Sequence, residues 1–323
     1  MTSSLRWLAL FLATIPAFAT VALAQNWPAR PVRIVVPSSP GGGTDAFARL
    51  ISSSLAAVLK QPFIVDNRPG ADGNIGTELA AKAAPDGYTI LVSAIPALVI
   101  NPYLHKNLPY NAETDFVPVA PGVISPLVLV VHSSVPATTL ADLIAIGKRA
   151  PGTLAYGSAG SGSSAYLGVR MLEEASGAQF LHVPYKGAGP ANQGLLSGDI
   201  QFRMTDMITI LPHIRSGKVR ALAVSIATDL LPRMQTLAQA GYTDLEIYAW
   251  FMVVAAKGTP PAIVQRLNAE INKAMKSPAN AERLREQALV PVFETPEQFT
   301  VNLRKARGNW SAFIQRNNIV AHQ

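Results

Sequence analysis

The chain has 323 residues, more than a single hydrophobic core usually organises, so its length predicts two lobes. It contains no cysteine, which excludes disulfides and thiolate chemistry. The formal net charge is +7, but the Lys and Arg residues are scattered and form no patch interleaved with aromatics. This pattern argues against nucleic-acid binding and leaves either a plain solvated surface or a general attraction for anions.

The N-terminus has the pattern of a secretory signal. Arg6 precedes an apolar stretch from Trp7 to Ala24 that ends in small residues. We therefore expect residues 1–24 to be removed after Ala24, leaving the mature protein in the periplasm. A retained membrane anchor is the alternative, but Pro16 and two threonines interrupt the stretch and no stop-transfer cluster follows.

Strands and helices alternate along the first hundred residues of the mature chain. Such alternation predicts a mostly parallel sheet covered by helices on both faces. The apolar run from Thr89 to Ile100 is interpreted as buried strand, because Ser and Pro interrupt it. The predicted strands are Arg33–Pro37, Phe63–Asp66 and Tyr88–Ala94, and the predicted helices are Thr44–Lys60 and Ile75–Ala84.

The alternation restarts after Asp115 and predicts a second sheet. Its expected strands are Leu127–Val131, Leu154–Gly157, Phe180–Val183, Ile200–Thr205 and Val219–Ser225, with helices at Thr139–Arg149, Ser163–Ala175 and Pro190–Leu196. The tail from Pro260 to Asn318 is predicted to be almost wholly helical and to have no sheet of its own, so it must pack back on the first lobe. The chain would then cross twice between lobes, near Val119–Ser125 and Glu246–Val254, and two crossings make a hinge. Lobe one is expected at residues 25–124 and 251–323, and lobe two at 125–250.

Two glycine-rich loops each lie between a strand and a helix. Backbone N–H groups and the positive end of the helix meet at such a place, and glycine lets a ligand approach the main chain. Taken alone, each loop could equally be a tight turn with a helix cap. As a pair, one in each lobe, they predict a cleft that binds a small carboxylate. The candidate residues are Ser38, Ser39, Gly42, Gly43, Thr44 and Asp45 in the first loop and Ser158, Ala159, Gly160, Gly162 and Ser163 in the second.

Arg203 lies near the carboxyl end of a strand that the pattern predicts to be buried. An unpaired guanidinium is costly there. Arg203 is therefore either a clamp for the ligand or, the preferred interpretation, the partner of Asp206 in a structural ion pair.

The sequence offers two enzymatic alternatives. Gly41–Ala46 fits a loose dinucleotide-binding pattern, with Asp66 ending the next strand, but Pro40 stiffens the loop entry and a nicotinamide enzyme would be out of place in the periplasm. No serine lies in a hydrolase elbow, and the histidines lack metal-ligand spacing. We expect no catalysis, no metal and no cofactor.

Ordered motifs extend along nearly the whole chain, and they include Trp27–Pro37, Pro40–Asp45, Val65–Gly70, Ala84–Thr89, Tyr156–Gly160, His182–Gly187 and Leu211–Arg215. With these motifs the chain resembles the Bug family, the TctC-type solute-binding proteins of tripartite tricarboxylate transporters. The resemblance implies an α/β, two-lobed periplasmic-binding-protein fold (Venus flytrap, type II) without catalysis. It also implies a carboxylate held by the two loops, and a transporter permease or a periplasmic sensor as the partner of a monomer.

Departures from the family pattern bear on the ligand. Ser38 stands where an aromatic residue is usual, the wall Ser93–Leu98 is more apolar than is common, and Thr205 replaces a frequent aspartate. These changes favour a di- or tricarboxylate or an aromatic acid over an amino acid. They add Ser93, Ala94, Tyr185, Arg203, Thr205 and Asp206 to the candidate ligand-binding residues.

Overall fold

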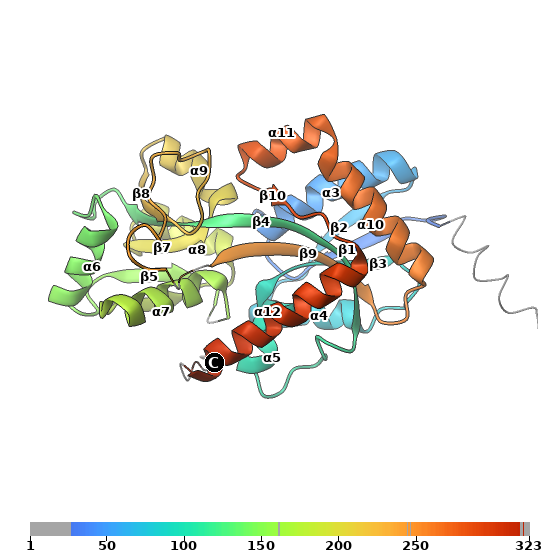
Figure 1. Ribbon diagram of the computed structural model, residues 1–323, viewed down its shortest axis with the longest axis horizontal. Coiled ribbons are helices and arrows are strands. Elements are labelled where there is room, and N and C mark those ends of the chain that lie inside the picture. Colours follow the sequence, from blue (N-terminus) through green and yellow to red (C-terminus); the bar gives the residue numbers. More distant parts are fainter. Residues whose placement is uncertain (1–26, 161, 244, 246, 317–318, 320–323) are drawn as a thin grey trace, which may run out of the picture.

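The computed structural model describes residues 27–160, 162–243, 245, 247–316 and 319. The predicted signal segment, residues 1–24, and its cleavage site lie outside this part. Within the described residues, ten strands join into one sheet in the order β2-β1-β3-β9-β4-β7-β5-β6, with β8 and β10 attached to β4. None of the described helices is both long enough and apolar enough to cross a membrane. Figure 1 shows two lobes along this sheet, connected by β4 and β9.

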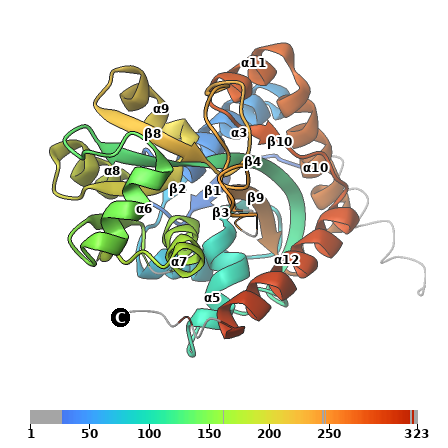
Figure 2. The same ribbon diagram turned by 60° about the vertical axis from the view of Figure 1, so that its left-hand side comes forward.

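Lobe one is formed by β2, β1 and β3, which run parallel, with helices around them. Its first strand is rich in β-branched residues and almost fully buried, as expected for a strand covered on both faces. The C-terminal helix α12 packs against β4, η2 and α5 (Figure 2). The elements are β1 (Val32–Val36), α3 (Gly43–Leu59), β2 (Phe63–Asn67), the 3₁₀ turn η1 (Ala71–Gly73), α4 (Asn74–Ala81), β3 (Thr89–Ala94), the π-helical turn η2 (Pro96–Ile100), α5 (Asn101–Leu104), α10 (Pro261–Lys276), α11 (Pro278–Glu286), β10 (Val290–Pro291) and α12 (Pro296–Arg316).

Lobe two repeats the arrangement with β6, β5 and β7 parallel to one another. Its first helix begins in a capping box, in which Thr139 and Asp142 satisfy each other's backbone N–H groups. The elements are α6 (Leu140–Arg149), β5 (Ala155–Ser158), α7 (Ser164–Ser176), β6 (Leu181–Pro184), α8 (Ala188–Ser197), β7 (Phe202–Asp206), α9 (Met207–Arg215) and β8 (Val219–Val224).

The strands β4 (Phe116–His132) and β9 (Tyr248–Ala256) belong to both lobes and confirm the two predicted crossings. They pair antiparallel with each other, and Ser125 lies opposite Ala249 at the passage from one lobe to the next. Each parallel group thus joins the crossing strands through antiparallel pairs, β3 with β9 and β7 with β4. The division at residues 124/125 and 250/251 stays a prediction, because both strands pass it without a break.

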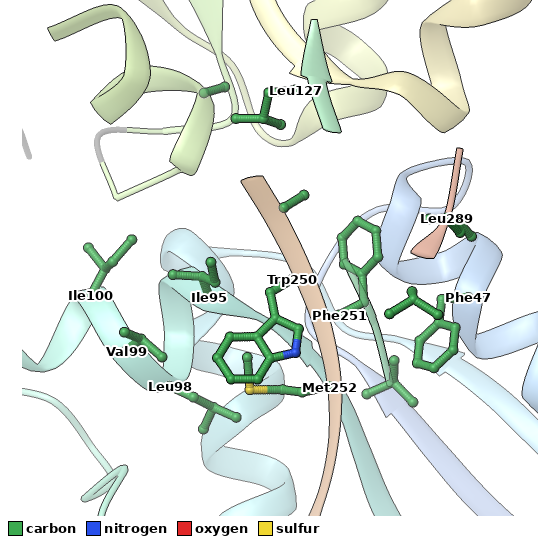
Figure 3. Close-up of a cluster of buried hydrophobic side chains, with 14 of the residues drawn as sticks. Phe47, Ile95, Leu98, Val99, Ile100, Leu127, Trp250, Phe251, Met252 and Leu289 are labelled. Carbon is green, nitrogen blue, oxygen red and sulfur yellow. The ribbon is translucent and has the colours of Figure 1, made fainter. Parts of the chain in front are cut away.

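The buried core continues from one lobe to the other along β4 and β9. Trp250 and Phe251 point to opposite sides of β9 (Figure 3). The Trp250 indole donates to the carbonyl of Pro121 at 2.6 Å, so its polar edge is satisfied within the core. The crossing is therefore a packed, hydrogen-bonded ribbon rather than a pair of loose linkers.

Two element predictions were wrong in detail. The stretch Thr89–Ile100 is not all strand, because the chain leaves the sheet after Ala94 and winds into η2, where Pro96 cannot donate to a strand ladder. The tail is almost wholly helical, as predicted, but it contains one short strand, β10, that was not predicted. Val290 and Pro291 pair with Ile124 and Val123 of β4, and two residues are too few to produce a readable period.

Candidate functional site

A cavity of about 780 Å³ lies between the two lobes. This is within the range of small-molecule sites. Most of the residues singled out in the sequence line it. From lobe one they are Ser38, Ser39, Gly42, Gly43, Thr44, Ser93 and Ala94, and from lobe two Ala159, Gly160, Ser163, Tyr185, Arg203, Thr205 and Asp206.

Three candidate residues do not belong to the wall. Asp45 lies behind the first loop, where its carboxylate accepts hydrogen bonds from the Gly41 amide at 3.1 Å and the Arg49 side chain at 2.9 Å. Ser158 is fully buried and braces the second loop through both backbone groups of Gly160. Gly162 packs against the Asn101 side chain of lobe one, with no room for a Cβ. These residues shape the loops from behind.

Helix N-termini meet at the cavity in larger number than the sequence suggested. Besides α3 and α7, which follow the two predicted loops, α4, α8 and α9 also begin at lining residues. The residues at these five helix starts that line the wall are Gly43, Gly73, Ser164, Ala188 and Asp206. Each helix start carries about half a positive charge and unpaired N–H groups. The cavity is therefore electrically suited to an anion.

Arg203 is 1% exposed and lies in the cavity wall. Its Nη1 donates to the carbonyl of Ala188 at 2.9 Å and to Oδ1 of Asn192 at 2.7 Å, while its buried Nε has no hydrogen-bond partner. Burial lowers the pKa of Arg203 to about 10, so the group is still a cation at neutral pH. Arg203 is therefore a buried positive charge whose Nε–H group can still donate a hydrogen bond.

The preferred sequence interpretation of Arg203 was wrong. Within the described residues, Arg203 and Asp206 form no ion pair. Hydrogen bonds connect them only through intermediates, since Asn192 donates to Thr209 at 3.0 Å and Thr209 donates to Asp206 at 2.9 Å, although the two charges attract each other beyond ion-pair distance. Asp206 is instead the N-cap of α9, and burial raises its pKa. The Asp206 carboxylate is used to cap α9, so it does not form the ion pair with Arg203 that their closeness in sequence suggested.

The two glycines in the lobe-one wall, Gly42 and Gly43, differ in the space around their Cα atoms. A methyl group at Gly43 would sit 2.5 Å from Cζ of Phe251, so this glycine is required by packing against β9. At Gly42 the nearest atom to such a methyl is 3.8 Å away, which leaves that position open to the cavity. The Ser38 hydroxyl is buried in the wall without a partner in the described residues.

The lobes touch each other beside the cavity. Ser39 donates from its hydroxyl to the carbonyl of Lys186 at 3.2 Å. The Asp72 carboxylate of lobe one lies against Gly160 of lobe two so closely that a Cβ there would be 2.0 Å from Oδ1. These contacts between lobes describe a closed cleft.

Several lining residues were missed in the sequence. Asp72, His105, Lys186, Ala188 and Phe251 all face the cavity. Asp72 and Lys186 follow strands β2 and β6 at their carboxyl ends, which is the place where open α/β sheets bind ligands, so that signal was available. His105 and Phe251 gave no such signal, because they reach the wall through the packing of α5 and β9.

The dinucleotide alternative does not fit this geometry. Asp66, which would have to bind a ribose, accepts hydrogen bonds from Arg33 at 2.6 Å and Arg68 at 2.9 Å. It does not line the cavity. The described residues also contain no group of three His, Asp or Glu side chains that could hold a metal ion.

A second hollow, of about 520 Å³, lies between α7 and α12. Two of its charged residues, Arg170 and Glu173, already pair with each other at 2.6 Å. No described helix begins at its lining residues, so it is the weaker candidate.

Comparison with known proteins decides the family. The profile of the "Tripartite tricarboxylate transporter family receptor", TctC, matches residues 47–319. The chain belongs to this family. It is 40% identical to Protein BugT of Bordetella pertussis over 98% of this chain and 97% of that protein.

Solved TctC relatives share the fold. The structure of the periplasmic binding protein BugD superposes with a TM-score of 0.87 at 30% identity, covering 92% of this chain and all of the other. R. palustris Rpa4515 with adipate gives 0.88 at 32%, covering 91% and 99%. MatC from Rhodopseudomonas palustris with bound malate gives 0.83 at 29%, covering 88% and 99%. The α/β periplasmic-binding-protein fold is thus confirmed, and the chain is a TctC-family solute-binding receptor rather than an enzyme.

Proposed function

We propose that this TctC receptor captures a small organic acid, either a di- or tricarboxylate or an aromatic acid, and presents it to the permease of a tripartite transporter. The observation that supports this most is Arg203, a buried cation in the cavity wall with an unpartnered Nε and no carboxylate paired with it in the described chain. A buried unpaired charge costs several kcal/mol, and an anionic ligand removes that cost.

The donors around the cavity can account for useful affinity. Each charge-assisted hydrogen bond contributes about 1.5–3 kcal/mol. A carboxylate held by Arg203 and by a few amides at the helix starts would reach micromolar binding even after the cost of association. The ligands named for the relatives, adipate and malate, are both dicarboxylates.

The remaining wall suits a ligand with a hydrocarbon part. Apolar side chains separate the polar groups, and they include Pro37, Ala94, Pro96, Leu127 and Phe251. Ser38 leaves room where an aromatic ring is usual in the family. The pocket is therefore wide enough for an aromatic acid as well as for an aliphatic one.

Closure of the two lobes completes the site in this proposal. The ligand first docks at the amides of the Pro40–Asp45 loop, and bending of β4 and β9 then brings Arg203 and the lobe-two helix starts onto it. Ligand binding selects the closed form because only that form makes both sets of contacts. The permease, or a sensor domain, reads the closed form in the periplasm after the signal peptide has been removed at Ala24.

A thermal-shift screen of the mature protein tests this function. Adipate, succinate and benzoate should raise the melting temperature, since a ligand that binds only the folded state stabilises it. The matched amides, adipamide and benzamide, should not, because they carry no negative charge. Equal shifts with acids and amides, or none with any acid, would refute the proposal. Small-angle scattering should show a smaller radius of gyration with a binding acid, and an unchanged radius would refute closure.

A further inference from the structure

Asp72 occupies a position in the cleft that the receptor function does not explain. It lies in η1 with left-handed backbone angles, φ 54° and ψ 30°, and Asn101 holds its carbonyl through a hydrogen bond of 3.0 Å. Its carboxylate lines the cavity and rests on Gly160 of the opposite lobe. A fixed carboxylate in the wall of a site for anions requires a reason.

The Asp72 carboxylate has few side-chain donors around it. Within the described chain its polar side-chain contact is His105, with Nε2 and Oδ2 separated by 3.5 Å. That Nε2 is itself buried without a hydrogen-bond partner. Arg203 is not within ion-pair distance of Asp72 in this part of the chain. Asp72, whose side chain is 21% exposed, thus retains acceptor capacity toward the cavity.

We propose, on the basis of the carboxylate-binding function above, that Asp72, with His105 beside it, determines specificity by accepting a hydrogen bond from a hydroxyl group of the ligand. The preferred ligand is then a hydroxylated carboxylic acid. Its carboxylate binds Arg203 from lobe two, while its hydroxyl satisfies Asp72 from lobe one. An acid without the hydroxyl leaves the Asp72 carboxylate desolvated and unpaired, which weakens its binding.

The surroundings favour a hydroxyl over an ammonium group as the donor. The starts of α3, α4 and α7 point positive potential into this region, and α4 begins two residues after Asp72. That potential opposes a cation but not a neutral hydroxyl. Thr205 replaces a frequent aspartate that could partner an ammonium group, and the neighbouring Asp206 is already engaged by Thr209 in capping α9.

Calorimetry on matched acids tests the proposal. Each pair consists of a hydroxylated acid and the same acid without the hydroxyl, namely malate with succinate and 4-hydroxybenzoate with benzoate. In the pair that fits the cavity, the hydroxylated acid should bind at least tenfold tighter. In Asp72→Gly this preference should fall to within about threefold. Glycine accepts the left-handed backbone at position 72, and Asp72→Asn, which also tolerates it and keeps an acceptor oxygen, should restore part of the preference. Lys60→Gly is the control, because it places glycine at another positive φ (56°) outside the cavity and should leave the preference intact.

The ratio of affinities separates recognition from a merely structural role. If Asp72 acts only as a contact between lobes, Asp72→Gly weakens both acids of a pair equally, and that result would overturn the proposal. A wild-type protein that binds the acids without preference, or prefers aspartate to malate, would overturn it too while leaving the receptor function standing. Failure to bind any of these acids would overturn both.

Discussion

The two sides of the cleft handle buried charge in opposite ways. In lobe one the Asp45 carboxylate lies behind its loop and is satisfied by Arg49, Asn67 and the Gly41 amide. In lobe two the Arg203 guanidinium lies in the wall and, among the described residues, hydrogen-bonds only to neutral partners, Asn192 and the carbonyl of Ala188. Asp45 has a direct ion-pair partner in Arg49, whereas Arg203 interacts with the Asp206 carboxylate only beyond ion-pair distance.

This difference separates a charge that builds the site from one that recognises the ligand. A buried charge with its partner in place stabilises the fold, so its removal should affect stability first. A buried charge without a counter-charge is costly in the empty protein and becomes favourable when a ligand supplies the counter-charge. Its removal should affect binding first.

Arg203→Met should have the largest effect on binding. We expect an affinity loss of at least a hundredfold for the best-bound acid, because a charge-assisted interaction is lost. The melting temperature should stay unchanged or rise, since a costly buried charge is removed. Calorimetry and thermal unfolding measure the two quantities. Arg220→Met is the control, because within the described part of the chain Arg220 donates only to the carbonyls of Val135 and Ala137 and lies outside the cavity. Lowered stability with intact affinity would make Arg203 structural.

Gly42→Ala should weaken binding about tenfold and leave stability nearly unchanged. The free protein has space for the methyl group, and the backbone at Gly42 is extended, with φ −86° and ψ 170°. A loss of affinity in Gly42→Ala would therefore show that the ligand approaches the loop amides closely. Gly308→Ala, in open space on α12, should not alter affinity in the same titration. Unchanged binding in Gly42→Ala would remove the first loop from the site.

Asp45→Asn should lower the free energy of unfolding by about 1–2 kcal/mol at pH 7 and affect binding least. Burial acts to raise the pKa of Asp45, but hydrogen bonds from Arg49, Gly41 and Asn67 outweigh it and lower the pKa. The stabilisation is thus present above the unfolded pKa, near pH 4, and lost as pH falls through the lower folded value. Urea unfolding should show that the difference in free energy of unfolding between wild type and Asp45→Asn is smaller at pH 3 than at pH 7. The control Asp229→Asn changes an exposed carboxylate and should not alter the free energy of unfolding at either pH. An effect of Asp45→Asn that does not depend on pH would contradict a stabilising role for the Asp45 charge.

Much of the fold could be predicted because its signals are local. A run of β-branched residues predicts strand β1, and apolar residues at helical spacing predict helix α3. Prolines mark the starts of α10, α11 and α12. One of the failures was non-local. The pairing of Val290 with Ile124 joins segments far apart in sequence, and no pattern in two residues predicts it.

The site residues also differ in whether a local sequence signal predicts them. The loops at Gly42 and Gly160 could be found because a strand, glycines and a helix follow one another directly. Whether Arg203 pairs with Asp206 could not be decided from sequence, since Asp206 is engaged by Thr209 in capping α9. His105 joins the wall only because α5 folds over η1, which places it beside Asp72.

The order of strands in lobe one has a consequence for how the chain folds. Strand β9 lies between β3 and β4, although it follows them by more than a hundred residues of sequence. The sheet of lobe one therefore stays split until Tyr248–Ala256 has been synthesised, whereas β5, β6 and β7 of lobe two are already adjacent in sequence. Contacts at such separation are slow to form. The half of the receptor that is made first is thus the half that is finished last, and a chain cut before Tyr248 would lose the strand that holds β3 to β4.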